Sequence, residues 1–161
     1  MKRITIIICI LLILVSAVLI PIRGATAKDN KTPFSGTKWI TYLVPGAYTY
    51  PDGTIHVRDQ YMEFLIDTDE SRMAGVEKVV ANANWNADGI GPVWGTFRLD
   101  VAPGSYWEGT FLGKLTEDGV FIKQVGVGKG DLNGLTMRAA IYLDSSTYNG
   151  VIEGVIIEHG Q

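Results

Sequence analysis

The sequence contains little of what covalent cross-links, metal sites and nucleophilic catalysis require. Its 161 residues include one cysteine, Cys9, and two histidines, His56 and His159. Cys9 lies in an apolar N-terminal run, so a mature chain without this run has no thiol for disulfides, thiolate catalysis or cysteine metal sites. The two histidines are far apart in the chain and lack co-ligands at coordinating spacing. We therefore predict no metal site, and the catalytic residues remain unknown.

Basic residues are also in the minority. Lysine and arginine total 14 against 17 for aspartate and glutamate, a formal net charge of −3. The charge is more negative still without Lys2, Arg3 and Arg23, which precede the mature chain predicted below. An acidic chain without a basic cluster is a poor candidate for binding nucleic acid or anionic membrane surfaces. We expect no nucleic-acid partner.

Phosphate-binding motifs are missing as well, although glycine is abundant. The longest glycine cluster, residues 126–135, fits neither the dinucleotide fingerprint nor the nucleoside triphosphate loop, and no helix pattern follows it. We therefore predict no nucleotide cofactor. Glycines in this cluster instead favour two strands that bend sharply.

The N-terminus has the pattern of an export signal. Lys2 and Arg3 supply the positive start, residues 4–20 the apolar run, and Ala25-Thr26-Ala27 the cleavage site. Residues 1–27 are therefore predicted to be a signal peptide of a secreted or cell-envelope protein. If the signal is retained instead, residues 4–20 would anchor the protein in the membrane.

The remainder reads as strands. Residues 28–36 are polar, contain Pro33 and Gly36, and predict a disordered lead-in. Residues 37–161 alternate apolar and polar side chains with regularly spaced turn residues, and no window predicts an amphipathic helix. Eight strands are predicted, the second with a break near Asp59: 38–44, 54–66, 73–86, 93–101, 106–116, 120–128, 132–143 and 151–158.

Two of these strands define their own register. A loop at residues 102–104, with Gly104 at positive φ, aligns two similar segments that begin at Trp94 and Trp107. One face then matches large apolar side chains to glycines or to each other, and the other sets Arg98 opposite Glu108. The predicted pairs are Leu99–Trp107, Phe97–Gly109, Gly95–Phe111, Val93–Gly113, Arg98–Glu108 and Thr96–Thr110.

Alternating rings and glycines are typical of a tightly curved sheet, and closing such a sheet removes its exposed edges. We predict an all-β fold, a single antiparallel eight-stranded closed or nearly closed β-barrel. A two-sheet sandwich is the alternative.

The stretch Gly128-Lys129-Gly130-Asp131-Leu132-Asn133-Gly134 and the preceding Trp-x-Gly-Thr-Phe hairpin resemble the allene oxide cyclase and dirigent-like barrel proteins. The resemblance covers about residues 75–158. It implies an eight-stranded barrel with an apolar cavity, which the plant members use to cyclise an unstable lipid epoxide or to steer radical coupling. No catalytic residue of those proteins matches a position in this chain.

Aromatic side chains are the candidate ligand-binding residues. In the predicted register Phe97, Trp107 and Phe111 share the apolar face, while Trp94 and Tyr106 share the face with the charged pair. We therefore expect an exported, non-catalytic barrel that binds a small apolar molecule or an envelope partner.

Two alternatives remain open. One is a cofactor-free isomerase or cyclase in which an inward tyrosine or carboxylate, such as Glu63, Glu77 or Glu153, acts on an apolar substrate. The other is a structural or adhesive envelope protein.

Overall fold

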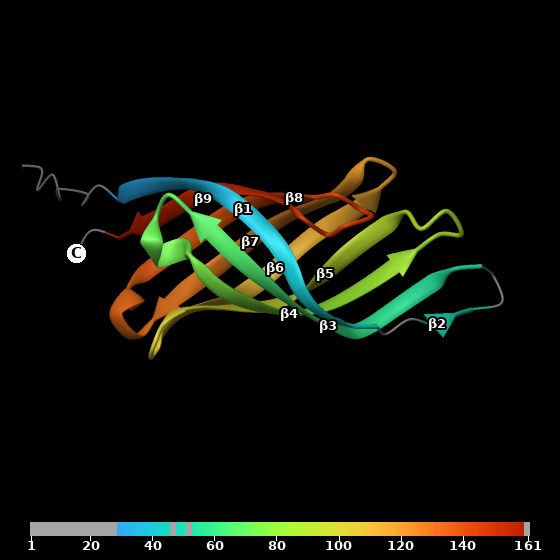
Figure 1. Ribbon diagram of the computed structural model, residues 1–161, viewed down its shortest axis with the longest axis horizontal. Helices are drawn as coiled ribbons and strands as arrows, with labels where there is room; N and C mark the ends of the chain where they lie inside the picture. The colour runs from blue at the N-terminus through green and yellow to red at the C-terminus, as the bar shows by residue number, and fades with distance from the viewer. Residues whose placement is uncertain (1–28, 46–47, 51–52, 160–161) are drawn as a thin grey trace, which may run out of the picture.

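The chain folds into a closed antiparallel barrel (Figure 1). The computed structural model describes residues 29–45, 48–50 and 53–159. The predicted signal at residues 1–27, including the apolar run 4–20, lies outside this range. No helix in the described part of the chain is long and apolar enough to cross a membrane.

The described residues contain nine strands and two short 3₁₀ helices. Eight strands close the barrel, which confirms the predicted fold, and the two-residue β2, which was not predicted, pairs with the outer end of β3. The strands are β1 (Asn30–Val44), β2 (Tyr48–Thr49), β3 (Ile55–Thr68), β4 (Gly75–Trp85), β5 (Gly91–Ala102), β6 (Ser105–Thr116), β7 (Gly119–Lys129), β8 (Leu135–Leu143) and β9 (Gly150–Glu158). The 3₁₀ helices are η1 (Ser71–Met73) and η2 (Gly130–Leu132).

Strand β1 closes the barrel because it pairs with two strands. Its first part pairs with β9, from Asn30 opposite Glu158, and its second part pairs with β3 as far as Val44 opposite Tyr61. The predicted disordered lead-in at residues 28–36 is therefore wrong from Asn30 onward. The sequence around Phe34 is polar and mostly exposed, which is why it resembled a disordered segment. In the structure, Phe34 is buried in the core and the backbone of this segment pairs with β9.

The predicted β5–β6 register is confirmed at all six pairs. Gly104 has a φ of 81°, as the turn requires, and the ladder continues to Ala102 opposite Ser105. A Cβ at Gly109 would lie 2.0 Å from the carbonyl oxygen of Val125, so only glycine allows β6 and β7 to approach this closely. The break in β3 is also confirmed, since Asp59 has a φ of 51° within a register shift.

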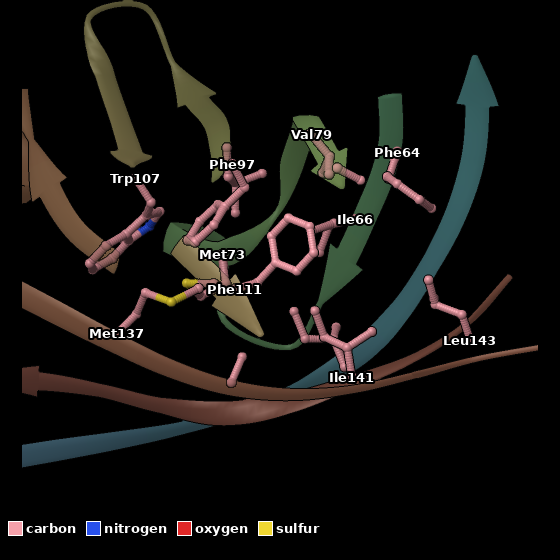
Figure 2. Close-up of a cluster of buried hydrophobic side chains, with 14 of the residues drawn as sticks. Phe64, Ile66, Met73, Val79, Phe97, Trp107, Phe111, Met137, Ile141 and Leu143 are labelled. Atoms are coloured by element: carbon pink, nitrogen blue, oxygen red, sulfur yellow. The ribbon is translucent and has the colours of Figure 1, made fainter. Parts of the chain in front are cut away.

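The two ends of the barrel differ. We call the end that carries η1, η2 and the β5–β6 turn the closed end, and the end with the β4–β5, β6–β7 and β8–β9 connections the open end (left and right in Figure 1). Trp107, Phe97, Met73 and Met137 pack together in the core toward the closed end (Figure 2). The Trp107 indole N–H also donates to the Arg72 carbonyl at 2.6 Å, which fixes η1 over this end.

Candidate functional site

The interior of the open end contains a cavity of about 50 Å³. Trp85, at the end of β4, and Tyr148, in the β8–β9 loop, place it near the rim. The walls are mostly apolar and include Val57, Val93, Phe111, Leu115, Val120 and Leu143. Apolar walls with a few polar groups are the usual lining of a small-molecule site.

Three polar side chains from three different strands meet inside the barrel. The Lys38 ammonium forms an ion pair with the Glu77 carboxylate, and both side chains are almost fully buried. The Gln124 amide donates to Glu77 Oε1 at 2.8 Å, so each carboxylate oxygen has a partner. Lys38 and Gln124 both line the cavity, as do Gln60 and Asn82, so Glu77 holds in place two of the polar side chains that border it.

The alternation of the strands explains why these residues point inward. Lys38 shares its face of β1 with Phe34, and Glu77 shares its face of β4 with the buried Val79 and Ala81. Among the three candidate carboxylates, Glu77 is the one the structure places inside. Sequence reasoning missed Lys38 and Gln124, and the available signal was a single polar residue at an inward position of an otherwise apolar face.

Two buried polar atoms have no hydrogen-bond partner among the described residues: the Trp85 indole nitrogen and the Gln124 Oε1 oxygen. Both residues line the cavity. Buried polar groups in folded proteins are usually paired, so an unpaired one calls for a partner such as a water, an ion or a bound molecule. The residues around the cavity therefore include one unpaired donor, at Trp85, and one unpaired acceptor, at Gln124.

The Lys38 side chain has an aromatic neighbour as well. Its Nζ lies 4.3 Å from the centroid of the Phe64 ring, which also lines the cavity. A ring face attracts a cation, so this contact stabilises the ammonium in an otherwise apolar environment.

The five predicted ligand-binding residues are not brought together. Phe111 lines the cavity, but Phe97 and Trp107 belong to the packed core. Trp94 and Tyr106 lie on the outside, as the register predicted, near opposite ends of the β5–β6 pair. Their ring faces are occupied: the Arg58 guanidinium lies 5.5 Å from the Trp94 ring, and that of Arg98 lies 3.6 Å from the Tyr106 ring.

The other two candidate carboxylates point outward. Glu63 accepts a hydrogen bond from the Tyr61 hydroxyl at 2.5 Å, and this bond, together with burial, raises the Tyr61 pKa to about 12. Glu153 lies on the exposed face of β9, beside a shallow outer depression that also includes Leu112, Phe121 and Val151. Neither carboxylate can act on a molecule inside the barrel.

The β8–β9 loop forms part of the rim. Its Asp144 carboxylate accepts hydrogen bonds from Ser146 and Thr147, which lower the Asp144 pKa to about 2. Asn149 Oδ1 accepts from the Ile40 backbone N–H at 3.1 Å and so joins the loop to β1. Tyr148 adopts a positive φ of 55° between these anchors and packs against the core beside the cavity.

No group of three or more His, Cys, Asp and Glu side chains among residues 29–45, 48–50 and 53–159 could hold a metal ion. His56 lies at the start of β3 at the open end, whereas His159 follows β9 at the closed end. No protein family, curated protein or solved structure matches this chain.

Proposed function

We propose that this protein is an exported, non-catalytic binding module that takes a small, mostly apolar molecule with one polar group into the cavity at its open end. The observation that carries the proposal is the combination of apolar walls with Lys38, Gln124 and Trp85, two of which present unpaired buried atoms. Export rests on the predicted signal at residues 1–27.

The energetics of the buried network support a binding role. Burying an ion pair costs desolvation energy, and well-packed apolar side chains of the same size are often as stable or more stable. Lys38, Glu77 and Gln124 are therefore not the choice that stability alone would favour for this interior. A polar group of the ligand placed beside them would give the unpaired Gln124 Oε1 a partner.

The dimensions of the cavity restrict the ligand. A site of about 50 Å³ holds only a few water-sized groups, so a small molecule, or one end of a longer molecule, would occupy it. The apolar walls suit a hydrocarbon part, and a hydroxyl group can donate to Gln124 Oε1 or accept from Trp85 Nε1. The resemblance to allene oxide cyclase and dirigent-like barrels implies the same kind of apolar cavity.

Titration with 1-butanol, followed on the Trp85 indole N–H resonance, tests the proposal. We expect a saturable shift of this resonance. Ala81→Leu, which adds a side chain to the cavity wall, should abolish the shift, whereas Ala140→Leu on the exposed face of β8 should leave it unchanged. A Trp85 resonance that does not respond to 1-butanol or to longer linear alcohols in the parent protein would contradict the proposal.

A cofactor-free isomerase or cyclase is the second candidate, favoured by the inward position of Glu77. This alternative requires that the protein chemically changes the bound molecule and that Glu77→Gln stops the change without preventing binding. A structural or adhesive role has less support, because the open end contains a cavity and Trp94 and Tyr106 do not form one flat patch.

A further inference from the structure

The buried Lys38 amine has the surroundings of a group that binds carbonyl compounds covalently. Its side chain lines the cavity and contacts the Glu77 carboxylate, which can accept a proton from it. Lys78 and Lys123 sit on the exposed faces of their strands, and the Lys78 ammonium pairs there with Asp100 at 3.1 Å. Lys38 alone of these three meets an apolar molecule inside the barrel.

We infer that the cavity takes a small apolar aldehyde and that Lys38 holds it reversibly as a protonated imine. This inference rests on the proposed function, because it assigns a ligand class to the same cavity. It adds a covalent bond and names the lysine that forms it.

The first requirement is an uncharged amine, since only the free lone pair attacks a carbonyl carbon. Transfer of one proton from the Lys38 ammonium to Glu77 gives an amine and a carboxylic acid, both uncharged. In an apolar interior this neutral pair avoids part of the desolvation cost that the separate charges carry. Gln124 keeps Glu77 oriented through its 2.8 Å hydrogen bond.

The lone pair of Lys38 then forms a C–N bond to the aldehyde carbon, and the C=O π electrons move to oxygen. Transfer of a proton from nitrogen to this oxygen gives a carbinolamine. Its hydroxyl can donate to Gln124 Oε1, the buried acceptor that has no partner among the described residues. Glu77 returns its proton to the hydroxyl, water leaves, and the nitrogen lone pair forms the C=N bond.

The reaction balances without an oxidant or reductant. One ammonium and one aldehyde give one protonated imine and one water, and Glu77 ends as the carboxylate that pairs with the new cation. The arrangement also selects among aldehydes: the apolar walls exclude sugars, whose many hydroxyl groups would lack partners there.

Butanal with borohydride tests the inference, because borohydride reduces an imine to a stable secondary amine. The purified protein is treated with both reagents, and the butylated lysines are located by peptide mapping. We expect Lys38 to be labelled about tenfold faster than the exposed Lys78, since the bound aldehyde is held beside the amine. Prior saturation with 1-butanol should suppress labelling at Lys38 but not at Lys78.

Lys38→Arg is the matched variant. Its guanidinium keeps the positive charge opposite Glu77 but gives no reducible imine, so no label should appear at residue 38. The mapping of the parent protein decides the question even if this variant does not fold.

The outcomes separate the two claims. If 1-butanol shifts the Trp85 resonance but Lys38 is labelled no faster than Lys78, the covalent inference is overturned and the binding function stands. If neither compound affects the cavity, both fail. Fast labelling at Lys38 that 1-butanol suppresses supports both.

Discussion

The closed and open ends of the barrel are built from the same strands, yet they treat their interior positions differently. Toward the closed end, Leu99, Trp107 and Met137 are completely buried among other apolar side chains. Midway along the barrel, Lys38 and Gln124 occupy inward positions, and a cavity extends from them to the open end. The comparison teaches that this fold stabilises itself at one end and can accept less favourable packing at the other.

The largest loss of stability is expected when the buried network of Lys38, Glu77 and Gln124, midway between the two ends, is broken. Glu77→Leu leaves the Lys38 ammonium buried without its carboxylate, which should lower the free energy of unfolding by about 3–5 kcal/mol. A triple variant should recover most of this loss, because none of the three polar groups is then left unpaired. It combines Lys38→Met, Glu77→Leu and Gln124→Leu. Urea denaturation measures both variants; equal instability of the two would contradict the argument.

A smaller difference in the free energy of unfolding is expected when leucine is replaced by alanine at each of the two ends. Leu99→Ala removes contacts on all sides and should cost about 3–5 kcal/mol, whereas Leu143→Ala should cost closer to 2 kcal/mol. Leu143 already borders the cavity, so part of its surface has few atoms to contact. Denaturant midpoints of the two variants, measured with a common slope, decide the order. A larger loss for Leu143→Ala would reverse our assignment of the well-packed end.

The smallest effect concerns pH at the open end. Because hydrogen bonds hold the Asp144 pKa near 2, below its ordinary value of 3.8, the stability that its carboxylate gives the β8–β9 loop is present above about pH 4 and is lost as the pH falls through 2. Hydrogen exchange of the Ser146 and Thr147 amides should therefore accelerate over this range, after correction for the intrinsic pH dependence.

Asp144→Asn is the control for this prediction. Its side-chain oxygen can still accept the loop hydrogen bonds but does not titrate, so the acid-dependent change in exchange protection should disappear. The same acid dependence in both proteins would mean that another group controls the loop.

Local features of the sequence predicted most of the fold. The β5–β6 register followed from residues separated by one short turn, where ring and glycine positions agree with the charged pair on the other face. Strand β1 could be recognised only in part, because residues 30–36 are ordered by β9, which is at the other end of the sequence. A pattern read from residues 30–36 alone cannot show that they pair with β9.

The site was predicted less well for the same reason. A lysine in a strand usually faces solvent, and Lys38 is buried because Glu77, 39 positions later, supplies the opposite charge. Glu77 was named as a candidate from its strand position, but its inward direction depends on the register of β4 against its neighbours. The aromatic candidates lie in three different places: the cavity wall, the packed core and the outer surface. Strand alternation predicts whether a side chain points into or out of the barrel, but not at which end of the barrel it lies.

The double pairing of β1 also has a kinetic consequence. The first strand of the barrel completes its ladder only when the last strand is available, since Asn30 lies opposite Glu158. Pairings of such long sequence separation are slow to form. Until then the edge of β9 stays unpaired, whereas Lys38 reaches Glu77 through the pairing of β1 with β3. The pairing of β1 with β9 is therefore what removes the last exposed edge of the barrel, while the pairing of β1 with β3 brings Lys38 to Glu77.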